Sequence, residues 1–401
     1  MRLRDMRELV RLRPIDLDAT RRRLAGCHDV SDLRRAARKR IPRPVFDYVD
    51  GGADEEVAMA ANVAAFRAWR FQPRVLADVA AADASAPLFG ATLPAPLVLA
   101  PTGYTMMMHP HGEAGVARAA ARRGLPYTLS TMSTTGIEDV AAAVAGADAT
   151  LWFQLYILRD RARQSGLVDR AAEAGFSALV VTVDTVVSGN RVRDARNGLT
   201  MPPSLTPGTV ASVAARPGYW LRLLSGPPVG FANFPDEKQS TISASAMFFN
   251  PGIDWQDITE LRKRWNGTLI LKGPIGPADA RRAVDAGVDA IQLSNHGGRQ
   301  LDRCVAPADL IAPVREAVGP SVPLLVDSGI RHGADIAVAL ALGADAAAIG
   351  RAYMYGLMAG GEAGVDHALS ILTREFRTTM RLLGVTSVAD LRKRGSELIT
   401  R

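Results

Sequence analysis

The sequence predicts a (β/α)8 barrel of the TIM type. From about residue 94 a short apolar run, a polar or glycine-containing break and an Ala-rich helical stretch recur in that order, and the runs number eight. Strands that alternate with helices form a parallel sheet, and eight such units in one continuous domain fit a closed barrel better than an open sheet. Because barrels place their chemistry on the loops after the strands, the residues that follow each run are the candidates for a site.

The eight predicted strands are short and apolar, and each is bounded by polar, glycine or proline residues. In chain order they are PLVLAP (96–101), YTLS (127–130), WFQLY (152–156), ALVVTVD (178–184), LILKG (269–273), AIQLSN (290–295), PLLVD (323–327) and AAAIG (346–350).

Two segments lie outside this repeat. We expect residues 1–90 to form a helical lead-in packed on a barrel of residues 91–401, with a glycine break in DYVDGGADEE at 47–56. Residues 198–253 form an insertion between the fourth and fifth strands that is rich in Pro, Gly, Ser and aromatic residues, and insertions of this length are usually lids or partly disordered loops. YWLRLL within it is either a hydrophobic lid edge or a contact to a membrane or partner protein.

Composition favours a soluble globular protein with a large core, since 48% of the 401 residues are apolar. The net charge of +7 invites a nucleic-acid or lipid partner, but arginines are spread over the whole chain and only five of the 48 basic residues are lysines. An arginine-rich scaffold that binds nucleic acid or lipid is therefore the weaker, non-enzymatic alternative. Two cysteines, the lack of a membrane-length apolar run and a charged N-terminus predict a cytoplasmic protein, with peripheral contact to the inner membrane face as a variant.

Polar residues and glycines gather at the strand ends. The stretches VDSGIRHG and IGRA place backbone N–H groups and arginines after strands seven and eight, where barrels bind phosphate, so we expect a phosphate-bearing cofactor. The residues at the strand ends are Thr102, Gly103, Ser130, Gln154, Tyr156, Thr182, Asp184, Lys272, Ser294, His296, Arg299, Asp327, Gly329, Arg331, Gly350 and Arg351.

Lys272 ends an apolar strand, where a cation without a partner is costly. It forms either a salt bridge to a carboxylate of the barrel or a fixed charge against a cofactor that becomes negative on reduction.

His296 differs from the other five histidines because it follows a strand and precedes two glycines and Arg299. A neutral imidazole there can accept a proton near pH 7, and a buried carboxylate such as Asp184 would stabilise its charged form.

These residues resemble a known family, the FMN-dependent L-2-hydroxy acid oxidases and dehydrogenases, which includes glycolate oxidase, lactate oxidase and L-lactate dehydrogenases. SNHGGRQLD at 294–302 is similar to the family signature almost letter for letter. The resemblance runs from about residue 30 to 395, through FDYVDGGADEE, APTGYTMMMHPHGE, WFQLY, GNRVRDARN, VDSGIRHGADI and IGRAYMYGL.

The resemblance implies FMN as cofactor and a role for each matching residue. His296 is similar to the catalytic base and Asp184 to its carboxylate partner. Arg299 and Arg191 would clamp the substrate carboxylate with Tyr48, and Tyr156 would meet the substrate hydroxyl. Lys272 would face the flavin N1–O2 edge. The remaining FMN contacts would be Thr102, Gly103, Ser130, Gln154, Thr182 and Ser294 around the ring and ribityl chain, Gly329, Arg331, Gly350 and Arg351 around the phosphate, and Asp327.

Three positions depart from the resemblance. Met132 in the substrate pocket stands where glycolate oxidase has tryptophan, Gly103 where many oxidases have alanine, and Ser328 where the phosphate loop has glycine. L-lactate is the preferred substrate, with lactate monooxygenase-like and mandelate-type activities as alternatives. The acceptor is oxygen or a quinone or other carrier, and both direct hydride transfer and prior formation of a carbanion remain open. Relatives are commonly tetramers, so a homotetramer is expected. A barrel of the isopentenyl diphosphate isomerase type is disfavoured by SNHGGRQ.

Overall fold

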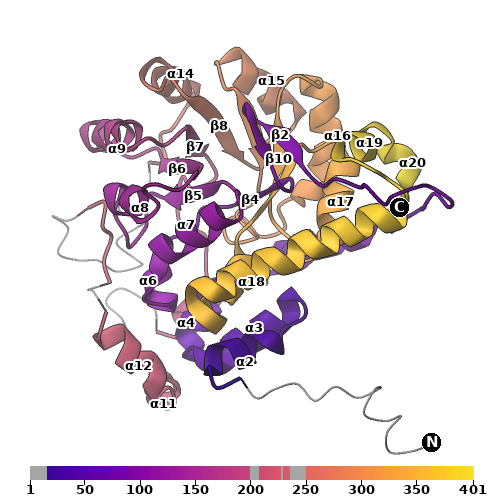
Figure 1. The fold of residues 1–401 in the computed structure, drawn as a ribbon. Coiled ribbons are helices and arrows are strands. Elements are labelled where there is room, and N and C mark those ends of the chain that lie inside the picture. Colours follow the sequence, from indigo (N-terminus) through magenta and orange to yellow (C-terminus); the bar gives the residue numbers. More distant parts are fainter. Residues whose placement is uncertain (1–15, 199–206, 227–228, 235–249) are drawn as a thin grey trace, which may run out of the picture.

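The computed structural model describes residues 16–198, 207–226, 229–234 and 250–401. Eight parallel strands close into a barrel in which each strand pairs with the next and β11 returns to β4, so the predicted fold class is confirmed (Figure 1). The strands are β4 (Leu97–Leu99), β5 (Tyr127–Ser130), β6 (Leu151–Tyr156), β7 (Ala178–Thr182), β8 (Thr268–Gly273), β9 (Ala290–Leu293), β10 (Leu324–Val326) and β11 (Ala346–Ile349).

Continuous apolar runs form these strands because both faces of each strand are covered. All five residues of β7 are buried, for example, and their partners on β6 and β8 keep Val180 level with Gln154 and Ile270. Parallel strands with helices outside and side chains inside lack the alternation of polar and apolar residues seen in half-exposed sheets. Polar residues therefore collect at the strand ends.

A small hairpin covers the amino-terminal end of the barrel. It consists of β2 (Ala86–Leu88) and β3 (Ala91–Leu93), which pair antiparallel. Leu88 and Leu93 belong to the same apolar cluster as Trp152 at the start of β6, and the rings of Phe89 and Trp152 meet edge to face at 5.5 Å. The opposite, carboxyl-terminal end is left for the site.

Helices surround the barrel on its outer side (Figure 1). The last of them, α18, is a long rod interrupted by non-helical backbone at Gly360 and Gly361. The helices are α6 (Thr105–Met108), α7 (Gly112–Arg122), α8 (Ile137–Ala143), α9 (Arg161–Glu173), α10 (Val192–Arg196), α14 (Trp255–Arg264), α15 (Pro277–Asp285), α16 (Pro307–Val318), α17 (Gly333–Ala341) and α18 (Arg351–Leu383).

The segment before the barrel is mainly helical and lies along α18 and the barrel mouth (Figure 1). The division at residue 90 stays a prediction. The strand β1 pairs with the last strand of the chain, β12, so the two ends of this layer meet. The elements are α2 (Ala19–Ala25), α3 (Val30–Arg40), α4 (Arg43–Asp50), α5 (Val57–Arg67) and β1 (Arg70–Phe71), joined at the other end of the chain by α19 (Val388–Lys393), α20 (Gly395–Leu398) and β12 (Ile399–Thr400).

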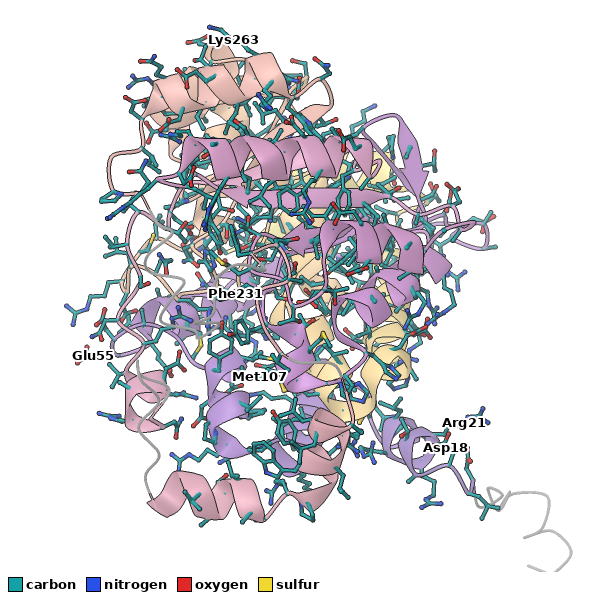
Figure 2. The ribbon with its side chains drawn as sticks, turned by 90° about the vertical axis from the view of Figure 1, so that its left-hand side faces the viewer. Asp18, Arg21, Glu55, Met107, Phe231 and Lys263 are labelled. Atoms are coloured by element: carbon teal, nitrogen blue, oxygen red, sulfur yellow. The ribbon has the colours of Figure 1, made fainter. Side chains whose placement is uncertain are left out.

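The insertion contains two helices, α11 (Pro207–Ala214) and α12 (Pro217–Leu224), where the sequence predicted only a lid or loop. The Tyr219 hydroxyl donates to the Met107 carbonyl at 2.7 Å, which holds α12 beside α6; Met107 is labelled in Figure 2. PPSLTP and residues 235–249 of the insertion lie mainly or wholly outside the described residues. Among the described helices, none combines the length and hydrophobicity needed to cross a bilayer.

Candidate active site

A cavity opens at the carboxyl-terminal end of the barrel, as the strand-end pattern predicted. Most of the predicted site residues line it, whereas Gln154, Thr182, Asp184 and Ser294 lie outside its lining at the ends of their strands. The predicted residues in the lining are Tyr48, Thr102, Gly103, Ser130, Met132, Tyr156, Arg191, Lys272, His296, Arg299, Asp327, Gly329, Arg331, Gly350 and Arg351.

His296 and Asp184 form a hydrogen-bonded pair at the cavity wall. His296 Nδ1 lies 3.1 Å from Asp184 Oδ1, and the backbone of His296 has a φ of 59° in the turn before Gly297 and Gly298. An ionised carboxylate only accepts, so Nδ1 carries the hydrogen and Nε2 keeps a free lone pair. The pair therefore presents a proton acceptor that is already oriented.

The charge on each member of this pair is tuned by its surroundings. Burial lowers the pKa of His296 below 6.5, Asp184 opposes part of that effect, and Lys272 adds to it. Burial raises the pKa of Asp184, but its interaction with His296, which includes a hydrogen bond, and the charge of Lys272 outweigh burial, so the pKa of Asp184 is lowered overall. At pH 7 the imidazole is therefore neutral beside a carboxylate that is ionised.

Two guanidinium groups flank the ring of Tyr48. The Cζ atom of Arg299 lies 5.0 Å from the ring centroid and that of Arg191 lies 5.6 Å from it. Arg191 is 3.7 Å from Asp194, and Arg299 Nη1 donates to the carbonyls of Tyr48 and Gly51 at 2.5 and 3.1 Å. Two partly buried cations beside the Tyr48 ring make a site that favours a carboxylate ligand.

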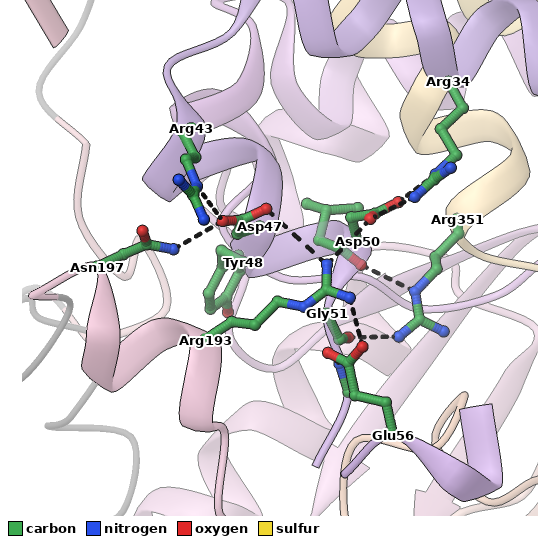
Figure 3. Close-up of polar contacts among 12 residues, drawn as sticks. Arg34, Arg43, Asp47, Tyr48, Asp50, Gly51, Glu56, Arg193, Asn197 and Arg351 are labelled. Carbon is green, nitrogen blue, oxygen red and sulfur yellow. Dashed lines mark hydrogen bonds and ion pairs between the residues drawn. The ribbon is translucent and has the colours of Figure 1, made fainter. Parts of the chain in front are cut away.

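Charged contacts on both sides anchor α4, which carries Tyr48 (Figure 3). Arg34 on α3 donates to both carboxylate oxygens of Asp50, at 2.6 and 2.8 Å. Arg193 on α10 pairs with Asp50 at 3.2 Å and also contacts Glu56. These pairs hold the end of α4 against the barrel, so Tyr48 is fixed at the cavity mouth.

Arg351, which the sequence places near the cofactor phosphate, makes contacts with three backbone carbonyls; its contact to a phosphate stays a prediction. Its Nε, Nη1 and Nη2 atoms donate to the carbonyls of Val49, Gly297 and Gly51 at 2.8, 2.7 and 2.6 Å. Burial lowers its pKa to about 10, so it remains charged at neutral pH. Arg351 thus joins the end of α4 to the loop that carries His296, while Arg331 Nη1 donates to the Ile330 carbonyl at 2.8 Å.

The sequence left open whether Lys272 forms a salt bridge with a carboxylate of the barrel. A carboxylate does lie near it, but at a long distance for an ion pair. Its Nζ lies 3.8 Å from Asp327 Oδ2. Asp327 already accepts hydrogen bonds from Gln292 Nε2, Ser294 Oγ and Ser328 Oγ at 2.6 to 2.7 Å. Asp327 therefore organises the strand ends, and Lys272 keeps donors for a group in the cavity.

Tyr104 and Phe231 also line the cavity, and the sequence did not single them out. Their rings meet edge to face at 4.8 Å. Phe231, labelled in Figure 2, comes from the insertion. The hydrogen bond from Ala232 N to the Ser133 carbonyl, at 3.1 Å, ties this part of the insertion to the barrel. Tyr104 directly follows the strand-end pair at 102–103 and was within reach of sequence reasoning, whereas Phe231 carries no periodic signal.

Comparison with known proteins places this geometry in a family. The model of the FMN-dependent dehydrogenases matches residues 37–398. The chain belongs to the FMN-dependent dehydrogenases. It is 45% identical to a putative L-lactate dehydrogenase of Mycobacterium tuberculosis, over 98% of this chain and 94% of that protein. It is 41% identical to an L-lactate dehydrogenase of Xanthomonas campestris, over 92% and 97% of the two chains.

Two solved structures show the same fold at full length. A monotopic membrane protein, (S)-mandelate dehydrogenase, superposes with a TM-score of 0.87 at 36% identity and covers 94% of this chain and 99% of that one. A mandelate oxidase superposes with a TM-score of 0.79 at 36% identity, over 92% and 98%. Membership of the FMN-dependent dehydrogenases decides for an enzyme and against a non-enzymatic scaffold.

The barrel mouth of this FMN-dependent dehydrogenase fits a flavin. Gln154 Nε2 and Thr182 Oγ1 are buried and have no partner among the described residues, which is costly unless a ligand supplies one. A Cβ added at Gly103 would lie 2.6 Å from the Met132 carbonyl oxygen, so alanine there requires the backbone to move. A flavin ring, with donors and acceptors along one edge, would supply partners of the kind that these atoms lack.

Proposed function

We propose that this enzyme oxidises a small L-2-hydroxy acid, L-lactate in the first place, to the 2-oxo acid. One observation carries the proposal: a neutral imidazole paired with a carboxylate shares a cavity with two arginines and the Tyr48 phenol. This set provides a base for a hydroxy acid and a clamp for its carboxylate. The relatives named L-lactate dehydrogenase support the choice of substrate.

Each protein group then has a defined task. Arg299 and Arg191 bind the substrate carboxylate, to which Tyr48 adds a hydrogen bond, and Tyr156 contacts the substrate hydroxyl. His296 Nε2 accepts a proton from the substrate, and Asp184 stabilises the imidazolium that results. Met132, Tyr104 and Phe231 form the wall that meets the substrate side chain.

FMN, when bound, accepts the two electrons of the oxidation. We infer that its ring and ribityl chain lie against Thr102, Gly103, Ser130, Gln154, Thr182 and Ser294. Its phosphate lies near Gly329, Arg331, Gly350 and the backbone beside Arg351. Lys272 sets a positive charge beside the ring, where it favours a cofactor that gains negative charge.

The yellow enzyme, mixed anaerobically with L-lactate, tests this function. Loss of the flavin absorbance at a rate that saturates with L-lactate supports the proposal. No bleaching with L-lactate, D-lactate or (S)-mandelate would contradict it.

A mandelate-type activity is the second candidate, because the solved neighbours include a mandelate dehydrogenase and the Tyr104–Phe231 pair forms a cavity wall whose size would decide between a methyl group and a ring. We expect Phe231→Ala to raise the ratio of kcat/KM for mandelate to that for L-lactate about tenfold, because a shorter side chain leaves room for a ring. Phe234→Ala is the matched control, since Phe234 is also buried but does not line the cavity. Equal ratios in the two variants would remove Phe231 from the specificity wall.

The pH dependence follows from the pKa of His296. Activity needs the neutral imidazole, so kcat/KM should fall as the pH drops through the lowered pKa, below 6.5. Asp184 raises that pKa, so Asp184→Asn should move the acid limb of the profile to lower pH and lower its plateau about 10- to 100-fold. Asp169→Asn, which changes an exposed carboxylate paired with Arg264, should leave the profile unchanged. An unmoved acid limb in Asp184→Asn would show that another group titrates.

We further propose that electrons leave to a quinone or other carrier at a membrane and that the enzyme is peripheral to the inner membrane face. Leu221 and Leu224 on α12 are 71% and 79% exposed, and one solved neighbour is a monotopic membrane protein. Paired exposed leucines on one helix are typical of an interfacial contact. The homotetramer stays a prediction.

Flotation with liposomes measures that contact. Leu221→Gln/Leu224→Gln should reduce binding about tenfold or more, because each leucine contributes about 1.5–3 kcal/mol when it leaves water. The control Leu76→Gln/Leu382→Gln changes two exposed leucines elsewhere and should bind like the unchanged enzyme. Equal loss in both variants would argue against α12 as the contact.

A further inference from the structure

The turn that carries His296 is held by two serine hydroxyls. Three consecutive backbone amides of this turn donate to them. The amides of Asn295 and Gly297 donate to Ser328 Oγ at 3.3 and 2.9 Å. The amide of His296 donates to Ser294 Oγ at 3.1 Å. Ser328 lies just after β10, the strand that pairs with β9, so the neighbouring strand end supports the turn.

One carboxylate fixes the direction of both hydroxyls. Ser294 Oγ and Ser328 Oγ donate to the same oxygen of Asp327, Oδ1, at 2.6 and 2.7 Å. Because the single hydrogen of each hydroxyl is directed at Asp327, the lone pairs of each oxygen face the amides of the turn. All three side chains are buried, so water competes little for these hydrogen bonds.

Ser328 has a backbone conformation that suits glycine better than serine. Its φ is 69°, in the left-handed region that residues with a Cβ rarely adopt. It is also one of the three positions where the sequence departs from the resemblance, which has glycine in this loop. A serine kept in an unfavourable conformation, with its hydroxyl fully engaged by the turn of His296, indicates that the hydrogen bonds of this side chain matter.

His296 depends on such support because of its own backbone. Three successive residues, His296, Gly297 and Gly298, have φ values of 59°, 67° and 74°. A run of this kind belongs to no helix or strand, so its orientation depends on partners outside it.

The other side of the turn is fixed without Ser328. The side-chain amides of Asn295 and Asn62 exchange two hydrogen bonds, both at 2.7 Å. Asn295 Oδ1 also accepts from the amide of Gly298 at 3.0 Å. Loss of the Ser328 hydroxyl should therefore loosen the turn without unfolding it.

We propose that Ser328 is a positioning residue: its hydroxyl holds the turn so that the His296 imidazole stays against Asp184 and faces the cavity. This role rests on the proposed function, in which His296 accepts the proton of the substrate. Arg299, which follows the same turn, is held separately by the carbonyls of Tyr48 and Gly51. Removal of the hydroxyl should therefore lower kcat and leave KM nearly unchanged.

Two variants separate the hydroxyl from the backbone. Ser328→Gly and Ser328→Ala both lack the hydroxyl, and only glycine also removes the cost of the positive φ. Ser321→Gly is the matched control, an exposed serine before β10. Stopped-flow absorbance of the FMN-loaded enzymes gives the rate of bleaching at saturating L-lactate and the half-saturating concentration. Hydrogen–deuterium exchange of the peptide that spans 294–302 reports on the turn independently of activity.

We expect both variants at Ser328 to keep FMN and to bleach about 10- to 100-fold more slowly at saturation, with the half-saturating concentration changed less than about threefold, because a misplaced base lowers the rate and the carboxylate clamp is untouched. The peptide should exchange about fivefold faster in both variants and not in the control, since each loses hydrogen bonds of the turn. Ser328→Gly should melt no lower than Ser328→Ala, so that its loss of rate does not come from lower stability.

Unchanged exchange of the peptide in both variants would overturn the proposal. A normal rate of bleaching in variants whose peptide exchanges faster would also overturn it, because the turn would then not position the base. Loss of FMN with unchanged exchange would instead assign Ser328 to the cofactor. If no hydroxy acid bleaches the unchanged enzyme, the proposed function fails, and the exchange measurement still decides whether Ser328 holds the turn.

Discussion

His296→Gln should still bind FMN but should lose most of its activity in oxidising L-lactate. The variant is expected to purify yellow, and anaerobic L-lactate should bleach it about 10²- to 10⁴-fold more slowly, the range expected for loss of general-base catalysis. Glutamine keeps the hydrogen bond in which the backbone N–H of residue 296 donates to Ser294 Oγ at 3.1 Å, but its side chain offers no base.

Stopped-flow absorbance of the flavin checks this result. His367→Gln is the control, because that histidine lies outside the cavity lining and its Nε2 contacts the Cys27 carbonyl at 2.8 Å. Bleaching of His296→Gln at the unchanged rate would exclude the imidazole as the base. A colourless protein would instead show that the turn around Gly297 has collapsed.

Arg299→Lys is expected to raise KM for L-lactate roughly 10- to 100-fold, since one or two charged hydrogen bonds, each about 1.5–3 kcal/mol, are lost. An ammonium group cannot bind a carboxylate with two parallel N–H groups, nor at the same time reach the carbonyls of Tyr48 and Gly51 that Nη1 now contacts. We therefore also expect a lower melting temperature.

Steady-state kinetics with thermal melts measure both effects. Arg303→Lys, at an exposed ion pair with Glu55, is the matched control and should change neither. A variant with normal KM but a lowered melting temperature would show that Arg299 stabilises the end of α4 and does not bind the substrate.

The barrel and the strand-end residues were predictable because burial on both faces leaves polar side chains only where a strand stops. Lys272 and Asp184 are buried charged residues at or after apolar strands, and that position alone marks them. The sequence did not predict the contacts of Arg351, because its acceptors are carbonyls at the end of α4, about 300 residues away in the chain. The sequence shows which residue type stands at each position, whereas the hydrogen-bond partners of that residue depend on how distant elements pack together.

Phe231 was missed for a related reason. Its segment has neither the 3.6-residue nor the 2-residue period, so no pattern shows which side chain turns inward. The Ala232–Ser133 hydrogen bond decides that orientation, and it joins parts of the chain that only the folded barrel brings together.

The contacts of Arg351 also bear on how this enzyme can be redesigned. One guanidinium joins the backbone before Gly52 to the backbone after His296, so the mouth that admits substrate and the turn that holds the base move as one body. Variant libraries that change the end of α4 and the turn after His296 separately would therefore produce many pairs of segments that no longer fit each other. Productive changes of substrate scope should therefore arise on the opposite wall, at Met132, Tyr104 and Phe231, which that tether does not reach.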